Sequence, residues 1–267
     1  MKPRPDAPML SDPSWSLGAG LEGRGVIVTG AAGGIGRATA RMMATAGARV
    51  AAVDIDRDGL EQTVAILEGR TDHLAVPFDL ADTAAIPDLV AWAVGRLGDL
   101  WALANVAAVL RRRSLDDVTE EDWNLQMDVN LKASFFLNRE AGNAMVAGGG
   151  GGRIINFASM AWLVGPFLGS DAYVISKAGI VSMTRGFART FGPHGILVNT
   201  VAPGQVDTPM QHQENTPEVM ERAMAMCPLG RMGRPEELAT VVLFLASRHS
   251  GFVNGATINV SGGLIMY

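Results

Sequence analysis

A tyrosine and a lysine four positions apart are the residues of this 267-residue chain best suited to moving a proton. Tyr173 and Lys177 stand in the run Tyr-Val-Ile-Ser-Lys, which we expect to be helical. Side chains four positions apart in a helix emerge on one face, so the phenol and the ammonium group can act together. A free tyrosine has a pKa of about 10. A neighbouring positive charge would lower that pKa and make Tyr173 a proton acceptor or donor near neutral pH.

Ser159 lies where it could hold the oxygen atom of a substrate. It follows the run Ile-Ile-Asn-Phe-Ala, which we expect to be a strand, and it precedes Tyr173 by 14 residues. A hydroxyl at the end of a strand can donate a hydrogen bond to an oxygen on which charge develops. Taken singly, Ser159 could be a helix cap, and Tyr173 with Lys177 one face of an amphipathic helix.

A glycine-rich turn after the first expected strand predicts a dinucleotide site. Residues 25–29 run into Gly-Ala-Ala-Gly-Gly-Ile-Gly at 30–36, and a helical apolar pattern follows. Gly30 and Gly34 allow a tight backbone path close to a pyrophosphate, and Gly36 lets the helix approach the sheet. The helix N-terminus offers free N–H groups and positive dipole to the phosphates. A purely structural turn is the alternative, and an acid downstream argues against it.

That acid, Asp54, favours NAD over NADP. It ends the second expected strand, 18 residues after Gly36, where its carboxylate can accept hydrogen bonds from the adenosine ribose. The same carboxylate would repel a 2′-phosphate. Gly33 stands where a basic residue could bind that phosphate, and no Lys or Arg directly follows Asp54. Asp54 as a simple turn former is the alternative interpretation.

The elements around these residues predict one α/β domain. Short β-branched runs alternate with helical segments, which is typical of βαβ units around a parallel sheet covered on both faces. The seven expected strands cover residues 25–29, 49–53, 73–78, 100–104, 153–158, 197–201 and 257–260. A reversal of strand order in such a doubly wound sheet opens a ligand crevice at the carboxyl ends of the strands. The residues above follow strands, as that crevice requires.

The charge of the chain argues against polyanionic partners. A formal net charge of −5 leaves no basic field to attract nucleic acid or an anionic membrane surface. The one basic cluster, Arg111, Arg112 and Arg113, we interpret as a solvated loop, with a site for an anionic substrate group as the alternative.

Cysteine and histidine contents predict neither a disulfide nor a metal site. Cys227 is the single cysteine, and the four histidines lack ligand spacing. Residues 1–20 contain four prolines and no apolar run of signal-peptide length. We therefore expect an extended N-terminal arm and a cytoplasmic protein.

From about residue 21 to the C-terminus, several motifs resemble those of the short-chain dehydrogenase/reductase family. They are the turn Thr-Gly-Ala-Ala-Gly-Gly-Ile-Gly at 29–36, Asp79 in Phe-Asp-Leu, Asn105 in Ala-Asn-Val-Ala, Asn130, Ser159, the Tyr173 and Lys177 pair, and Ala-Pro-Gly at 202–204 followed by Thr208. Two motifs depart from the family pattern. Residues 104–108 lack the family's first Asn and final Gly, and Ser261 stands where an acid is common.

The resemblance implies a Rossmann-type NAD-binding domain over residues 21–267 and a catalytic set of Asn130, Ser159, Tyr173 and Lys177. In that set, Lys177 would also hold the nicotinamide ribose and Asn130 would support a water chain from Lys177 to solvent. Asp79 would contact the adenine edge, and Thr208 the carboxamide. The implied cofactor contacts are Gly30, Gly34, Ile35, Gly36, Asp54, Asp79, Leu80, Asn105, Tyr173, Lys177, Pro203, Gly204, Val206 and Thr208.

The implied reaction is hydride transfer between the nicotinamide and a secondary alcohol or ketone. Two alternatives are a 3-oxoacyl thioester reductase of lipid synthesis, for which NADPH is more usual, and a dinucleotide sensor without catalysis. We expect the substrate to contact Trp162, Phe167 and Met210, with residues 205–228 as a lid. The family resemblance also implies a homotetramer.

Overall fold

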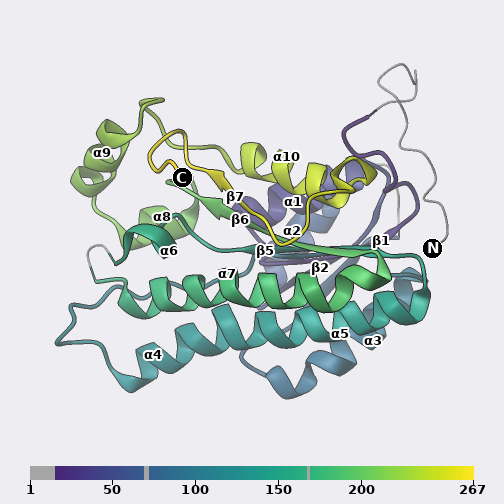
Figure 1. Cartoon of the computed structure of the whole chain (residues 1–267). Coiled ribbons are helices and arrows are strands. Elements are labelled where there is room, and N and C mark those ends of the chain that lie inside the picture. Colours follow the sequence, from purple (N-terminus) through teal and green to yellow (C-terminus); the bar gives the residue numbers. More distant parts are fainter. Residues whose placement is uncertain (1–15, 69–71, 167–168) are drawn as a thin grey trace.

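Seven parallel strands form a single sheet at the centre of the molecule (Figure 1). The computed structural model describes residues 16–68, 72–166 and 169–267. The strands follow the order β3-β2-β1-β4-β5-β6-β7. Their bounds are β1 Gly25–Thr29, β2 Arg49–Asp54, β3 Leu74–Pro77, β4 Ala102–Asn105, β5 Gly152–Phe157, β6 Ile196–Pro203 and β7 Thr257–Val260. All seven expected strands are confirmed: β1 and β7 match at both ends, and the ends of the others differ by at most two residues.

Helices cover both faces of the sheet. The helices before β5 are α1 Gly34–Thr45, α2 Arg57–Ala65, α3 Ile86–Leu97, α4 Glu120–Gln126 and α5 Ala133–Gly148. The later ones are α6 Ala161–Val164, α7 Asp171–Phe191, α8 Pro209–Glu214, α9 Pro217–Met226 and α10 Pro235–Ala246. Helices α1 and α10 pack together on one face, while α3, α5 and α7 cover the other (Figure 1).

Alternating side chains of the buried strands divide the core into two layers. In β1, Val26 and Val28 join the core beneath α1 and α10, whereas Ile27 joins the core beneath α3 and α5. Neighbouring residues of a strand point to opposite faces, so a strand covered on both sides must be apolar at every position. The Gly-Val-Ile-Val-Thr sequence of β1 meets this requirement, and all five residues are buried.

The strand order reverses between β1 and β4, and this places the ligand crevice. Strand β1 pairs with β2 on one side and with β4 on the other. The connections from β1 and β4 therefore leave in opposite directions, and a crevice opens between them at the carboxyl ends of the strands. Every strand is parallel, so the loops that follow β1, β2, β4, β5 and β6 reach this same edge.

Residues 16–20 form turns that pack on the helical layer of α1 and α10. Ala19 is buried, Leu17 packs against the core, and a Cβ on Gly18 would lie 2.5 Å from the Cβ of Ala46. The expectation of an extended arm up to residue 20 is therefore wrong for residues 16–20, because apolar contacts hold them. Residues 1–15 lie outside the described part of the chain.

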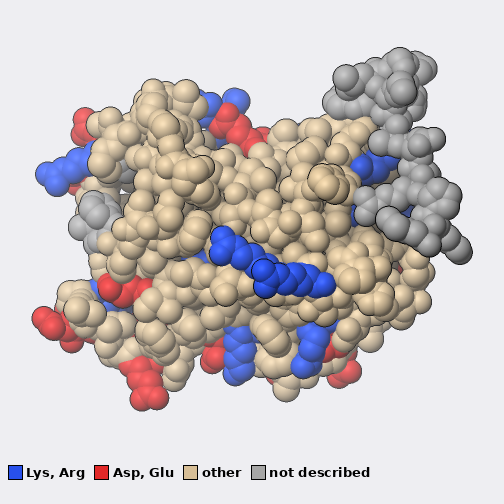
Figure 2. Space-filling view, viewed as in Figure 1, with Lys and Arg blue, Asp and Glu red and all other residues tan. Residues whose placement is uncertain are grey.

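The surface carries charges of both signs. On the face drawn in Figure 2, basic and acidic side chains lie scattered over a mainly uncharged surface. Among the helices that the structure describes, none combines the length and apolarity needed to cross a membrane.

Candidate active site

The turn between β1 and α1 has the shape of a phosphate cradle. Gly30 has a φ of 69°, and a Cβ there would lie 2.8 Å from backbone atoms of Ala107. A Cβ on Gly36 would lie 1.9 Å from the carbonyl oxygen of Gly30. Helix α1 begins at Gly34 and its N-cap, Gly33, has no side chain to bond the first N–H groups. These groups and the glycine backbone fit a pyrophosphate.

Asp54 lies at the end of β2 and lines the cavity that begins at this turn. Its carboxylate accepts hydrogen bonds from the backbone N–H of Ala32 at 3.0 Å and of Asp56 at 3.1 Å. Each carboxylate oxygen has a further lone pair for a ligand hydroxyl. Two backbone bonds hold the acid beside the phosphate turn, in the position expected for a ribose contact.

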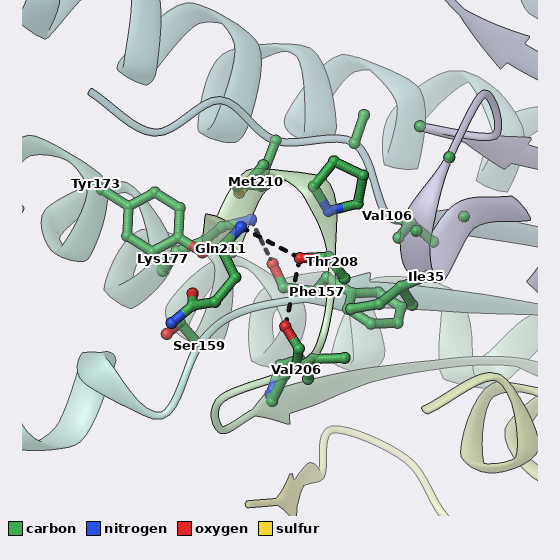
Figure 3. Close-up of a pocket in the computed structure, with 18 of the residues that line it drawn as sticks. Ile35, Val106, Phe157, Ser159, Tyr173, Lys177, Val206, Thr208, Met210 and Gln211 are labelled. Carbon is green, nitrogen blue, oxygen red and sulfur yellow. Dashed lines mark hydrogen bonds between the residues drawn. The ribbon is translucent and has the colours of Figure 1, made fainter. Parts of the chain in front are cut away.

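A first cavity of about 440 Å³ lies along the carboxyl edge of the sheet. It runs from the glycine turn to the tyrosine and lysine of α7 (Figure 3). The structure brings the following expected residues together in its wall: Gly30, Gly34, Ile35, Gly36, Asp54, Ser159, Tyr173, Lys177, Pro203, Gly204, Val206, Thr208 and Met210. Wall residues that the sequence did not indicate include Val106, Ala107, Ala108 and Phe157, whereas Gln211 and Gln213 belong to the expected lid.

Three expected cofactor contacts lie outside this wall. Asp79 and Leu80 follow β3, and the N–H of Phe78 donates to the carbonyl oxygen of Asp54 at 2.8 Å. Their loop therefore starts beside the acid, and a contact with the adenine edge stays a prediction. Asn105 is buried and its amide donates to Asn156 at 3.0 Å. In this structure Asn105 joins a polar network across the sheet, and the cavity is lined instead by the residues that follow it.

Tyr173, Lys177 and Ser159 meet at one end of the cavity, as their spacing predicts (Figure 3). Lys177 is only 2% exposed, and its Nζ donates to the carbonyl oxygen of Phe157 at 2.8 Å. The same Nζ lies 5.6 Å from the centroid of the Tyr173 ring. Ser159 lines the same part of the wall as Tyr173, and its side chain acts to lower the pKa of the phenol. A phenol, a hydroxyl and an amine thus face one space.

The ionisation of this group differs from the sequence expectation. Burial raises the pKa of Tyr173 to about 12, while the hydrogen bond from Ser159 and the positive charge of Arg112 act in the opposite direction. Burial also lowers the pKa of Lys177 to about 7. In the protein by itself desolvation dominates both groups, and no contribution of Lys177 to the pKa of Tyr173 is resolved. A lowering of this pKa by Lys177 together with a bound nicotinamide stays a prediction. The charge of Arg112 is the smallest of the three contributions to the pKa of Tyr173.

Asn130 supports the loop after β4 from a π-helical turn, Met127–Lys132. Its side chain is fully buried, accepts from the N–H of Val109 at 2.8 Å and donates to the carbonyl oxygen of Val109 at 2.9 Å. It also donates to the hydroxyl of Ser176 at 3.2 Å, one residue before Lys177. Asn130 therefore links the loop after β4 to α7 and does not line the cavity itself.

A second cavity of about 460 Å³ adjoins the first. The two share a wall made of Ser159, Tyr173, Gly204, Met210 and Gln211. The second cavity is mainly apolar, and α9 contributes Val219 and Met226 to it. Part of the expected lid, residues 205–228, thus forms walls of both cavities through α8 and α9.

Of the two expected substrate contacts that the structure describes, Met210 lies in these walls and Trp162 does not. Trp162 packs instead against the cluster of Ala158, Ile180, Val181 and Ala202, with its ring 5.7 Å from that of Tyr267. Phe167 lies outside the described residues. Arg112 lines the second cavity. The sequence offered a site for an anionic substrate group at its cluster only as the alternative, because a run of three arginines gives no sign of which one turns inward.

Comparison with known proteins assigns the family. Residues 30–265 match the family model described as Enoyl-(Acyl carrier protein) reductase. The chain is 40% identical over 249 residues to (3R)-3-hydroxyacyl-CoA dehydrogenase of Rattus norvegicus, covering 90% of this chain and 95% of that protein. This chain belongs to the short-chain dehydrogenase/reductase family. It is an oxidoreductase that acts on hydroxyl or keto groups with a nicotinamide dinucleotide.

Other members show the range of this family. The chain is 38% identical over 248 residues to 3-oxoacyl-(acyl-carrier-protein) reductase FabG of Thermotoga maritima, covering 92% of this chain and 99% of that protein. It is 35% identical over 244 residues to D-threitol dehydrogenase of Mycolicibacterium smegmatis, covering 91% and 93%. The solved structure of a short-chain type dehydrogenase/reductase from Mycobacterium marinum superposes with a TM-score of 0.87 at 30% identity, covering 94% of this chain and 98% of that one.

Proposed function

We propose that this protein is an NAD-dependent secondary-alcohol dehydrogenase or ketone reductase in which Tyr173 exchanges the proton. The observation that carries the proposal is the wall shared by the two cavities, where Ser159 and Tyr173 stand together. The first cavity begins at a glycine turn that fits a pyrophosphate, and the second is an apolar chamber. A cofactor in one and a substrate in the other would meet at these two side chains.

The roles follow from the positions of the side chains. When bound, the nicotinamide accepts or supplies the hydride. Ser159 donates a hydrogen bond to the substrate oxygen, and Tyr173 takes the hydroxyl proton of an alcohol or gives a proton to a ketone. Lys177 contacts the nicotinamide ribose, and its hydrogen bond to the carbonyl oxygen of Phe157 fixes its position at the end of β5. Asn130 keeps the loop after β4 in place and supports the water chain to solvent.

NAD preference rests on Asp54 and its surroundings. The carboxylate is fixed at the cavity wall, where a 2′-phosphate would meet a negative charge in place of a cation. Gly33, where a basic residue could stand, has open space around the position of a Cβ. Exposed Ile55, an apolar residue, follows the acid.

A 3-hydroxyacyl thioester is a second candidate substrate. The observation that favours it is the set of relatives named for 3-hydroxyacyl-CoA and 3-oxoacyl-(acyl-carrier-protein) substrates. Asp54 argues against NADPH but not against an NAD-linked oxidation of such a thioester.

We also propose a homotetramer. Met127, Leu131, Phe135 and Met183 line an apolar hollow on the outer side of α5 and α7, and Phe135 is 43% exposed. Apolar surface of this kind is typical of a face covered by another subunit. Light scattering should give about four times the chain mass of 28.1 kDa. The cytoplasmic location stays a prediction.

The test is the absorbance of reduced nicotinamide with purified protein, NAD or NADP, and a panel of secondary alcohols. The panel contains sugars, cyclic terpenoids, steroids and 3-hydroxyacyl-CoA, with the matching ketones assayed in reverse. We expect NADH to form with one substrate class and much less NADPH with any. Tight binding of NAD without turnover on the whole panel would contradict catalysis and favour a dinucleotide sensor.

A further inference from the structure

The second cavity has a single charged residue among the described residues of its wall, and that residue is Arg112. The rest of the wall is apolar or neutral, with Met160, Val164, Met226 and Ile265 among its apolar members. A guanidinium carries several N–H donors, so one in an apolar wall can bind an anion through charge-assisted hydrogen bonds. The position of this charge therefore affects which ligands the second cavity can bind.

The loop that carries Arg112 turns alternate side chains in opposite directions. Leu110 and Arg112 line the cavity, whereas Arg111 and Arg113 are exposed, and Arg113 pairs with Asp122 at 3.2 Å. The interpretation of the cluster as a solvated loop is thus right for its outer members and wrong for Arg112.

Backbone bonds on both sides hold this orientation. The N–H of Arg111 donates to the side chain of Gln126 at 3.0 Å, and the N–H of Arg113 donates to the carbonyl oxygen of Gly169 at 2.9 Å. Gly169 has a φ of +71°, and a Cβ there would lie 2.1 Å from the carbonyl oxygen of Arg113. Because the loop is fixed at both neighbours, Arg112 is held toward the cavity.

Arg112 lies in the same cavity wall as Tyr173, the proposed proton-exchanging residue. Both Arg112 and Tyr173 line the second cavity, and the charge of Arg112 lowers the pKa of Tyr173. A guanidinium carries five N–H donors in a planar fork that matches a carboxylate, so it can bind neighbouring backbone groups and a ligand together.

We propose that the substrate is a secondary alcohol or ketone with a carboxylate on an apolar frame, and that Arg112 binds this carboxylate. The inference rests on the proposed function, since it needs the reacting carbon at Ser159 and Tyr173. The apolar wall takes the frame, and the carboxylate sets which face of the carbinol carbon lies toward the cofactor cavity. Arg112 is then the residue that separates acidic substrates from their neutral analogues.

The experiment compares acids with their methyl esters on the NAD-bound enzyme. The probes are 3-hydroxybutyrate and 3-hydroxycyclohexanecarboxylate, each with its methyl ester, assayed for kcat/KM and titrated by calorimetry in the presence of NAD. The variants are Arg112→Met, which removes the charge, Arg112→Lys, which keeps it, and Arg111→Met as the exposed control from the same loop.

We expect the wild type to prefer at least one acid over its ester by about tenfold or more, in kcat/KM or in affinity. Arg112→Met should lose this preference while still turning over the ester, Arg112→Lys should keep part of it, and Arg111→Met should keep all of it.

An equal loss on acid and ester, with a shifted pH profile, would mean that Arg112 acts only through Tyr173 and would overturn the proposal. So would an unchanged acid preference in Arg112→Met, or no preference for either acid in the wild type. Absence of turnover on all four probes would count against the proposed function for this substrate class, and the calorimetric comparison would still decide whether Arg112 binds the acid.

Discussion

The two edges of the sheet both bury basic side chains, but they use them differently. At the amino edge, Arg153 is buried and its guanidinium lies 4.9 Å from the centroid of Trp101. It donates to the carbonyl oxygen of Ser247 and to the hydroxyl of Ser250, each at 3.3 Å. At the carboxyl edge, Lys177 and Arg112 line cavities. The basic side chain at the amino edge bonds other groups of the protein, whereas those at the carboxyl edge line cavities that can hold a ligand.

The amino edge is a closed network. Arg24 lies 4.5 Å from the centroid of Trp101 and pairs with Asp99 at 2.9 Å, and Asp99 accepts the N–H of Gly25 at 2.7 Å. The indole N–H of Trp101 donates to the carbonyl oxygen of Ala246 at 2.8 Å. These contacts join β1, β4, β5 and the end of α10. Burial lowers the pKa of a basic group at either edge, to about 10 for Arg153 and about 7 for Lys177. A shifted pKa therefore does not by itself mark a functional site in this protein, and the adjacent cavity does.

The largest effect should come from Tyr173→Phe. Turnover should fall about a thousandfold or more, because the phenol oxygen is the proposed proton carrier, while the affinity for NAD changes little. Steady-state kinetics and NAD titration measure the two quantities. The control is Tyr267→Phe, which alters the one other tyrosine of the chain, exposed at the C-terminus, and should leave turnover intact. Normal turnover in Tyr173→Phe would remove this residue from the mechanism.

Arg153→Ala should act on stability and not on chemistry. It removes the packing on Trp101, leaves a cavity and deprives Ser247 of a donor, so the free energy of unfolding should fall by about 3 kcal/mol. Urea denaturation measures this change. Arg96→Ala is the matched control, since exposed Arg96 lies 5.5 Å from the ring of exposed Trp92 and should contribute about 0.5 kcal/mol or less. Equal losses in the two variants would contradict a structural role for the amino edge.

Changing the charge beside the ribose position should change cofactor preference. Asp54→Ala combined with Gly33→Arg removes an anion and adds a cation, and Gly33 has an extended φ of −164° that any residue can adopt. The ratio of kcat/KM for NAD to that for NADP should fall about a hundredfold. Asp58→Ala, an exposed acid on α2, is the control for general charge loss. If the ratio of kcat/KM values is unchanged in the double variant, Asp54 does not contact the ribose.

The smallest expected effect is a pH-dependent stability difference at Lys177. Its pKa is lowered to about 7 in the folded protein, so between about pH 7 and the unfolded value of 10.5 the unfolded chain binds more protons. Wild-type stability should therefore gain with rising pH in this window, whereas Lys177→Met lacks the gain. The stability of Lys177→Met relative to the wild type should fall by about 2 kcal/mol from pH 7 to pH 9. Lys132→Met, at an exposed lysine paired with Asp128, should show no such trend, and an equal trend in both variants would refute the buried-charge explanation.

The features predicted from sequence are those set by local spacing. Helical periodicity puts Tyr173 and Lys177 on one face. Gly30 and Gly36 are required because a Cβ at either position would lie within 3 Å of backbone atoms. The inward turn of Arg112 was not predictable, because it depends on the contact between Arg113 and Gly169, far apart in sequence. The location of Trp162 depends likewise on packing against Tyr267 at the other end of the chain. The pKa of Tyr173 follows from burial, which spacing does not reveal.

The most direct test of this division between the edges is a crossed comparison of Tyr173→Phe and Arg153→Ala. Both the denaturation midpoint and kcat are measured for each variant under conditions where it is folded. We predict that Tyr173→Phe loses kcat and keeps its midpoint, and that Arg153→Ala loses midpoint and keeps its kcat. A loss of kcat in folded Arg153→Ala as large as that in Tyr173→Phe would contradict the account.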